Sequence, residues 1–257
     1  MLTPPEIARS LLAAGESKAR LPFGKMLLLA ILAGAYIALA GVGATAAAVT
    51  VESGSLAKLL SACVFPAGLS MVILAGSELF TGNCLMVMAL LERRITPAQL
   101  LRNWLTVYLG NAMGGAAVAA LAVYSHTASL FGDGLARSMV SIAESKAALG
   151  AGDAFLRGVL CNFLVCLAVW MAAASKRAEG KVIALFFPIL LFVLCGYEHC
   201  IANLYYLPAG AFAAAEYGVE TTLTLAGCLK NLAAVTLGNL VGGAALGVGY
   251  RFAYLKE

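Results

Sequence analysis

Long stretches without a charged residue dominate the chain and predict helices that cross a membrane. Eight stretches follow one another, and short polar segments separate most of them. A helix needs about 20 apolar residues to cross the hydrocarbon layer, so the second and third stretches share one span, as do the sixth and seventh. The pattern therefore predicts six membrane spans. The stretches are 26–51, 59–77, 79–91, 103–132, 158–175, 182–197, 199–215 and 231–250.

The chain contains an internal repeat. Residues 103–115 read NWLTVYLGNAMGG and residues 231–243 read NLAAVTLGNLVGG, which places the shared positions 128 residues apart, half the length of the chain. Each half carries three spans, an odd number, so the second copy is expected to be inverted relative to the first. The alternative is that the glycines are only small-residue packing faces of membrane helices. The shared residues are Asn103, Val107, Leu109, Gly110, Asn111, Gly114 and Gly115.

Two of the predicted spans are interrupted by polar residues. Glu78 interrupts the second span, and Glu198, followed by His199, interrupts the fifth. A helix broken inside a membrane is tolerated only where its free backbone groups face protein or a water-filled path. Two such breaks at the interface of inverted repeats indicate a transport site. We expect each glutamate to accept hydrogen bonds from backbone amides freed by the break, the alternative being a carboxylate pair for acid/base chemistry.

The distribution of basic residues predicts the orientation. Twelve of the 17 lysines and arginines fall on one side of a six-span chain and five on the other, which places both termini in the cytoplasm of a multi-pass protein of the inner (plasma) membrane. We expect a single domain over 1–257. Its parts are an N-terminal interfacial helix (1–24), a first repeat (25–125), an external loop (126–152), a second repeat (153–250) and a C-terminal tail (251–257). A gating role is the alternative for the N-terminal helix.

Composition narrows the class of protein. With 62% apolar and 12% charged residues, the chain is unlike a water-soluble domain or a nucleic-acid-binding module. No nucleophile motif, phosphate loop or metal-ligand spacing is present, so we expect no enzyme, catalytic residue, metal or cofactor. An intramembrane enzyme or cofactor-binding subunit stays as an alternative, although His126 and His199 are the only histidines. The seven cysteines are expected to be reduced packing residues.

His199 is the strongest functional candidate from the residues themselves. It lies between Glu198 and Asn203 in a broken span, and an ionisable residue inside a membrane is a functional hypothesis by default. Imidazole is also the side chain whose charge changes near neutral pH. Lys146, in contrast, reads as an ordinary solvated lysine of the segment between the third and fourth spans.

Four segments resemble a known family. They are GSELFTGN at 76–83, NWLTVYLGN at 103–111, CNFLVCLAVWM at 161–171 and GYEHCIAN at 196–203, and they resemble the signature segments of the formate/nitrite transporter family of formate, nitrite and hydrosulfide channels. The resemblance covers all six spans. It implies an all-α, aquaporin-like bundle of two inverted three-helix repeats with broken second and fifth helices, assembled as a homopentamer with one pore per subunit.

The resemblance also implies roles for particular residues. It assigns a central pore or proton relay, and it assigns the attraction of anions to Lys146. The central residues are His199, Thr81, Glu198, Asn203 and Asn162, and the apolar constriction is formed by Phe65, Leu69, Phe80, Val165 and Phe192. The motif ending Gly82-Asn83 differs from the serine-threonine of some formate channels.

These features predict a channel or proton-coupled transporter for small monovalent anions of weak acids, such as formate, nitrite or hydrosulfide. The expected partners are these anions, protons, the lipid bilayer and further copies of the chain in a homopentamer, with no nucleic acid. The cargo is expected to pass the constriction as the neutral acid. An aquaporin-like pore for neutral solutes is the alternative, although the paired NPA motifs of that class are missing from the sequence.

Overall fold

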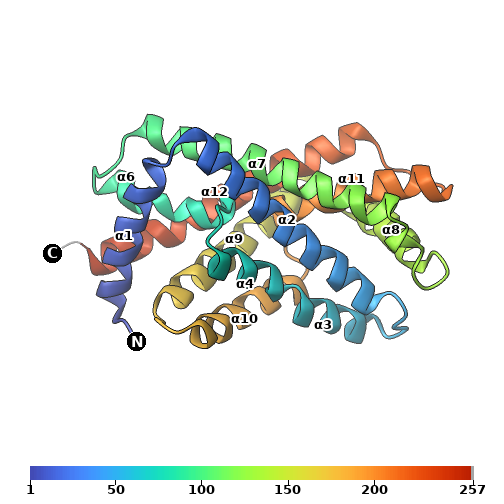
Figure 1. The fold of residues 1–257 in the computed structure, drawn as a ribbon, viewed down its shortest axis with the longest axis horizontal. Helices are drawn as coiled ribbons and strands as arrows, with labels where there is room; N and C mark the ends of the chain where they lie inside the picture. The colour runs from blue at the N-terminus through green and yellow to red at the C-terminus, as the bar shows by residue number, and fades with distance from the viewer. Residues whose placement is uncertain (256–257) are drawn as a thin grey trace.

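The computed structural model describes residues 1–255, and every regular element in this range is helical (Figure 1). The elements of the first half are α1 (Pro4–Ala19), α2 (Phe23–Ala48), α3 (Gly54–Val64), α4 (Pro66–Ala75), α5 (Phe80–Asn83), η1 (Cys84–Met86), α6 (Val87–Leu91) and α7 (Pro97–Tyr124). Those of the second half are η2 (Thr127–Ser129), α8 (Gly134–Ala148), α9 (Ala151–Ala173), α10 (Ala178–Leu194), α11 (Cys200–Tyr217) and α12 (Leu225–Tyr254).

Five helical segments are long and apolar enough to cross a membrane: α2, the continuous α3–α4 pair, α7, α9 and α12. The shorter apolar segment Phe80–Leu91 continues the second span beyond its break. In the second half of the chain, α10 and α11 are the two parts of the fifth span. The predicted all-helical fold with broken second and fifth helices is therefore confirmed.

Both breaks begin at a glycine with a left-handed backbone. Gly76 has φ +79° and Gly196 has φ +69°, a conformation that glycine adopts without steric cost and that commonly ends a helix. Three extended or irregular residues follow in each case before a new helix starts at Phe80 or at Cys200. The local sequence thus sets both the end of each first half-helix and the start of the next.

Close helix packing relates the two halves of the chain. Helix α2 packs along α7, and α9 packs along α12. A Cβ on Gly114 would overlap the carbonyl oxygen of Ile31, and a Cβ on Gly242 would overlap that of Val159. The two glycines are 128 positions apart, as are the two residues they touch. The repeated glycines therefore allow the same backbone contact in each half, so packing and repetition both explain them.

The predicted external loop, 126–152, is largely helical, because Gly134–Ala148 forms α8. Its buried residues are spaced as an apolar stripe that packs on α11; they are Leu135, Ala136, Met139, Val140, Ala143 and Ala147. The predicted tail from 251 also continues as helix to Tyr254, and residues 256–257 lie outside the described residues.

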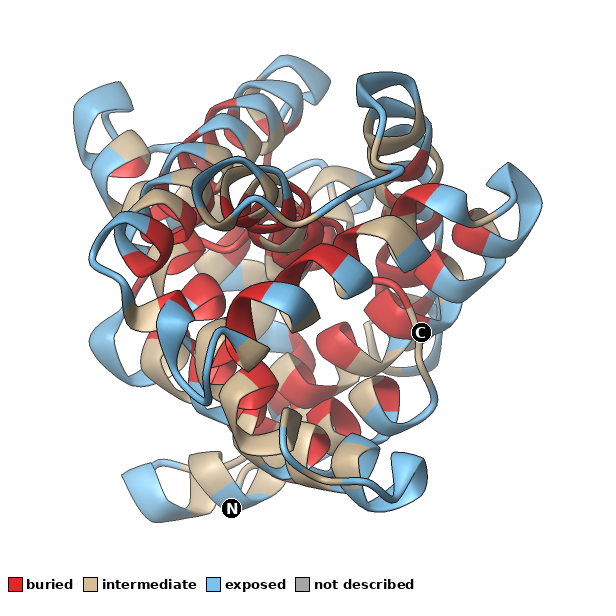
Figure 2. Cartoon of the chain, turned by 90° about the vertical axis from the view of Figure 1, so that its right-hand side faces the viewer, coloured by how far each residue is buried: buried red, intermediate tan, exposed pale blue. Residues whose placement is uncertain are grey.

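The two ends of the bundle are distinct. Both termini lie at the end that carries α1, whereas α8 lies at the opposite end (Figure 1). Buried residues gather toward the middle of the bundle and exposed residues on its outside (Figure 2). Large apolar side chains such as Leu28, Leu105 and Leu121 point outward, as expected for a surface that contacts lipid or another subunit rather than water.

Candidate transport path

Three separate cavities lie between the two ends of the bundle. The α1-side vestibule and the α8-side vestibule each have a volume of about 410 Å³, and a central cavity of about 10 Å³ lies between them. Leu69 and Leu79 line both the α1-side vestibule and the central cavity. Phe65, Phe192 and His199 line both the α8-side vestibule and the central cavity. These five side chains therefore separate the vestibules from the centre.

The central cavity is narrow and almost entirely apolar. Its volume is close to that needed for one water molecule. The rings of Phe65 and Phe192 meet edge to face with centroids 5.6 Å apart, and Val165 lies in the same wall. Solutes of several atoms cannot occupy this volume, so these side chains must move during passage.

Four of the five predicted constriction residues line the central cavity, and Phe80 does not. The Phe80 ring packs instead against Trp104 and Tyr108, with centroids 6.4 and 5.1 Å away. Leu79 takes its place at the cavity. Leu79 is the last extended residue before the helix that begins at Phe80, and the contacts of the Phe80 ring with Trp104 and Tyr108 keep it away from the cavity.

His199 and Thr81 meet beside this cavity, as the resemblance implied. The Thr81 hydroxyl lies 2.9 Å from Nε2 of His199, and both residues are buried. The backbone N–H of Ala202 donates to Nδ1 of His199 at 3.1 Å, so the imidazole caps the start of α11. An accepting Nδ1 carries no proton, and the neutral ring then carries it on Nε2. Nε2–H therefore donates to Thr81, whose own hydroxyl proton is left for another acceptor.

A buried ionic cluster lies at the inner end of the α8-side vestibule. The Lys146 ammonium donates to both carboxylate oxygens of Glu198, at 2.9 and 3.1 Å. The Asn203 amide donates to the same carboxylate at 2.7 Å and to Oδ1 of Asn231 at 2.8 Å. Lys146 also lies 5.3 Å from the centroid of the Tyr206 ring, a distance favourable for a cation–π contact. Lys146, Glu198 and Asn203 thus form one unit.

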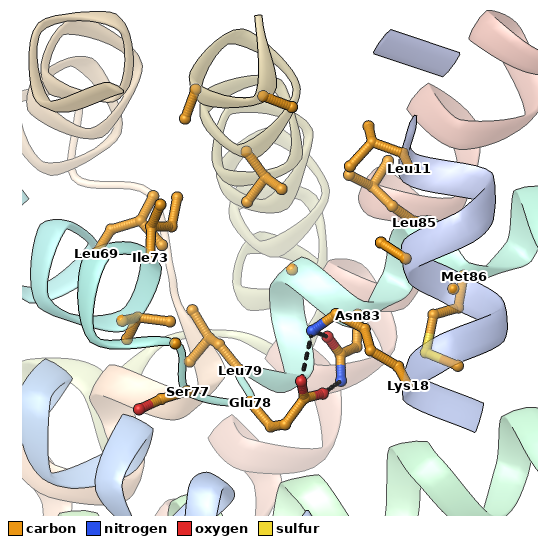
Figure 3. Close-up of a pocket in the computed structure, with 18 of the residues that line it drawn as sticks. Leu11, Lys18, Leu69, Ile73, Ser77, Glu78, Leu79, Asn83, Leu85 and Met86 are labelled. Carbon is orange, nitrogen blue, oxygen red and sulfur yellow. Dashed lines mark hydrogen bonds and ion pairs between the residues drawn. The ribbon is translucent and has the colours of Figure 1, made fainter. Parts of the chain in front are cut away.

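A second cluster with the same design lines the α1-side vestibule (Figure 3). Lys18 donates to Glu78 at 2.8 Å and to Oδ1 of Asn83 at 2.9 Å. The Asn83 amide donates to Glu78 at 2.7 Å and to Asn103 at 2.9 Å. Sequence reasoning did not single out Lys18. The repeat could have indicated it, because Lys18 precedes Lys146 by 128 positions, the offset of the repeated motif.

The same offset relates α1 to α8. Glu16 forms an ion pair of 3.8 Å with Arg94, and Glu144, 128 positions later, accepts a hydrogen bond of 2.6 Å from the backbone of Thr222. Arg94 and Thr222 are also 128 positions apart. The repeat therefore includes one helix before the first membrane span of each half, which extends it beyond the predicted boundaries of 25–125 and 153–250.

The expectation that Glu78 and Glu198 accept backbone amides at the breaks is wrong. The Phe80 N–H donates to Oδ1 of Asn111 at 3.0 Å, and the Asn111 amide donates to the carbonyls of Ala30 at 2.7 Å and Glu78 at 2.9 Å. The glutamate side chains are occupied by lysine and asparagine donors. A charged ammonium is a stronger partner for a carboxylate than a backbone amide is, which leaves the amide to a neutral acceptor.

Asn239 repeats this arrangement at the second break. Its Oδ1 accepts from the Cys200 N–H at 2.8 Å, and its amide donates to the carbonyls of Gly158 at 2.8 Å and Glu198 at 2.9 Å. The second asparagine of the repeated motif therefore anchors the break in each half. This explains why the motif and the broken spans occur together.

Asn162 connects the two halves rather than lining a cavity. Its amide donates to the carbonyl of Thr81 at 3.2 Å and to that of Asn239 at 2.7 Å, and the residue is fully buried. These contacts hold the start of the α5 half-helix against α9 and α12. Asn162 therefore contacts the backbone of Thr81 and does not line the central cavity.

Comparisons with known proteins agree with this architecture. The profile of the formate/nitrite transporter family matches residues 5–253. A probable formate transporter of Methanothermobacter thermautotrophicus is 38% identical over 99% of this chain and 98% of its own length. The formate channel FocA of Haemophilus influenzae is 39% identical over 86% of this chain and 84% of its own.

Solved structures give the same result. An FNT family ion channel superposes with a TM-score of 0.86 at 32% identity, covering 96% of this chain and 98% of that one. A pentameric formate channel with formate bound gives 0.80 at 33% identity, covering 91% and 98%. The fold and the path define a membrane transport protein of the channel type. The chain belongs to the formate/nitrite transporter family.

Proposed function

We propose that this chain conducts small monovalent anions of weak acids, such as formate, nitrite or hydrosulfide, across a membrane, and that the cargo crosses the central cavity as the neutral acid. The observation that carries this proposal is the polarity change along the path. Positively charged vestibules open toward an apolar centre in which His199, hydrogen-bonded to the buried Thr81, is the polar residue of the lining. The relatives named as formate channels support formate as one cargo.

The energy of the two possible routes favours protonation. An ion at the centre of a bilayer meets a cost between ~3 and ~17 kcal/mol. Protonating a carboxylate with a pKa near ~4.3 at pH 7 costs roughly 3.7 kcal/mol. Because the walls formed by Phe65, Leu69, Leu79 and Phe192 offer an anion no charge or donor, the neutral acid meets the lower barrier.

His199 acts in this proposal as a hydrogen-bond partner that orients Thr81. The imidazole donates from Nε2, so the Thr81 hydroxyl can donate in turn to an oxygen or sulfur atom of the cargo. Adding a proton at Nδ1 would break the hydrogen bond from Ala202 and remove the cap of α11. The proton of the cargo is therefore expected to come from vestibule water and not from the ring.

Lys146 and Glu198 form a polar wall where the α8-side vestibule meets the constriction, and Asn203 donates to Glu198. In the proposal the Lys146 ammonium, paired with Glu198, offers a hydrated anion a hydrogen-bond donor at the edge of the apolar segment. The matching Lys18 cluster does the same at the other end, so transport can run in both directions.

We also propose a homopentamer in an inner (plasma) membrane, with both termini in the cytoplasm. The pentameric relative supports the assembly, and the excess of basic residues at the end that carries α1 supports the orientation. Helix α1 (Pro4–Ala19) is proposed to lie along the membrane surface beneath the α1-side vestibule.

Replacing His199 tests the proposed function. We expect His199→Phe and His199→Asn to reduce uptake of labelled formate into proteoliposomes by a similar factor at each pH, because the ring orients Thr81 and does not supply the proton. His126→Asn is the matched control, because His126 lies near Tyr217 and away from the path. Wild-type flux with an unchanged pH profile in both His199 variants would reject a role for this residue. Flux of the unaltered protein that is independent of pH would favour a neutral-solute pore.

A further inference from the structure

The charge of Lys146 is largely compensated, so it is poorly suited to collect anions by itself. Its ammonium contacts both oxygens of Glu198, at 2.9 and 3.1 Å, and lies over the Tyr206 ring. The side chains of Lys146 and Glu198 are only 15% and 7% exposed. An anion in the vestibule therefore meets an ion pair here, whose net charge is zero.

Two other cations line the same cavity without a carboxylate partner. Lys58 is on α3 and Arg157 is on α9, so they approach the α8-side vestibule from different helices. Within residues 1–255, neither side chain makes an ion pair or hydrogen bond. Both residues are exposed. No direct contact with a carboxylate compensates their charges, which can therefore attract an anion in the vestibule.

Free hydroxyl donors complete the set. Ser141 and Ser145 on α8 line this vestibule, and their hydroxyls make no hydrogen bond to the part of the chain that the structure describes. Two uncompensated cations and two free hydroxyls around a cavity of about 410 Å³ provide what a small hydrated anion needs, namely positive potential and hydrogen-bond donors.

The α1-side vestibule lacks this set. Its ion pair, Lys18 with Glu78, corresponds by the repeat to Lys146 with Glu198, but its one further cation is Lys181 on α10. The position 128 before Arg157 is Leu29, which is uncharged. In the broken spans the offset is shorter, 122 between Pro66 and Pro188, and the position 122 after Lys58 is Gly180, next to Lys181. Arg157 therefore has no charged counterpart, and the α8-side vestibule holds one unpaired cation more than the α1-side vestibule.

We propose that Lys58 and Arg157 form an anion-binding subsite in the α8-side vestibule, with Ser141 and Ser145 as hydrogen-bond donors, and that this subsite makes binding of monovalent anions tighter from that side than from the α1 side. The inference rests on the proposed function and adds to it the residues that set affinity. Lys146 then serves mainly to hold Glu198 and the second break in place.

The experiment compares half-saturation for labelled formate in proteoliposomes at constant pH. Removing a unit charge roughly 7 Å from an anion in water changes its local concentration by about threefold. Lys58→Gln and Arg157→Gln should each raise the half-saturation concentration about threefold, and the double variant about tenfold, with maximal flux near that of the unaltered protein. The effect should shrink in 0.5 M salt because exposed charges are screened.

The matched control removes two basic residues from the same end of the molecule but outside the vestibule. Arg137 lines a separate surface cavity, and Lys230 is an exposed residue near the start of α12. The double variant Arg137→Gln/Lys230→Gln has the same net charge as the test variant and should keep the original half-saturation. Lys58→Arg and Arg157→Lys, which retain the charge, should do so as well.

The outcomes separate this inference from the proposed function. The subsite does not exist if the Lys58/Arg157 double variant has an unchanged half-saturation concentration. It also does not exist if the half-saturation concentration of the control double variant rises equally. If the unaltered protein carries no labelled formate, nitrite or hydrosulfide, the proposed function fails instead. In vesicles of known orientation, equal half-saturation from both sides would also overturn the inferred asymmetry.

Discussion

The linkers at the two helix breaks have nearly the same backbone and carry different side chains. Leu79 has φ −110° and ψ 123°, and His199 has φ −111° and ψ 113°. Each precedes a half-helix whose first amide is held by an asparagine, and each follows a glutamate paired with a lysine. Duplication therefore preserves the parts that hold a break open in the membrane. The difference lies at the position that faces the central cavity.

The difference shows how an inverted repeat acquires one chemical site. Leu79 closes one side of the cavity, while the equivalent His199 meets Thr81 from the other half. The repeat partner of Thr81 is Ile201, which has no hydroxyl. One half thus supplies the imidazole and the other the hydroxyl, so the polar pair forms once at the interface.

Removing the lysine of each ionic cluster should have the largest effect on stability. Lys146→Met leaves the buried Glu198 carboxylate without its cation, at a cost of about 3 kcal/mol. Lys18→Met should cost less, because the Lys18 side chain is 29% exposed against 15% for Lys146. Thermal unfolding in detergent checks the order. Adding Glu198→Gln should restore stability to Lys146→Met, and equal loss in both lysine variants would contradict the comparison.

The anchoring asparagines should come next, with nearly equal effects in the two halves. Asn111→Leu and Asn239→Leu each leave a buried amide and a carbonyl without a partner, which costs about 2 kcal/mol. Asn239→Asp retains the acceptor for the Cys200 amide and should fall between the wild type and Asn239→Leu. A much smaller effect in one half would show that the two breaks are held differently.

The central pair should affect flux rather than stability. Thr81→Val removes a hydrogen bond worth about 1 kcal/mol, which corresponds to a loss of roughly fivefold in flux. Ile201→Val changes the repeat-related position and should leave flux unchanged. Thr81→Ser should recover most of the activity in the same uptake measurement. Equal flux in the valine variants at positions 81 and 201 would remove the functional distinction between the two breaks.

The smallest effect concerns the contacts that anchor α1 and α8. The Thr222 N–H, with the hydroxyls of Thr221 and Thr222, lowers the pKa of Glu144 from its ordinary value of 4.5. These contacts are therefore fully present above pH 4.5 and are lost as the pH falls through the lowered pKa. Glu144→Gln should increase amide exchange in 219–223 at neutral pH, with the difference from wild type narrowing in acid. The Glu16–Arg94 ion pair should respond to salt instead.

Much of the fold could be predicted from the sequence because the relevant signals are local or periodic. Apolar length predicts the spans, Glu78 and Glu198 reveal the interruptions, and the fixed offset reveals the repeat. The charged-residue pattern did not reveal that α8 is a helix, since its apolar stripe is short. The resemblance added Thr81 opposite His199, which no local pattern could indicate across a separation of 118 residues.

The sequence by itself determined the apolar helices, the two breaks and the doubled motif, because hydropathy and repetition are properties of the linear chain. Only the tertiary structure decided which groups pair. It pairs the Glu78 carboxylate with Lys18, 60 residues away, and the Phe80 amide with Asn111, 31 residues away. It also turned Leu79 toward the path in place of Phe80. Such choices depend on how packed helices present neighbouring side chains, and several donors compete for each acceptor until the fold brings one within reach.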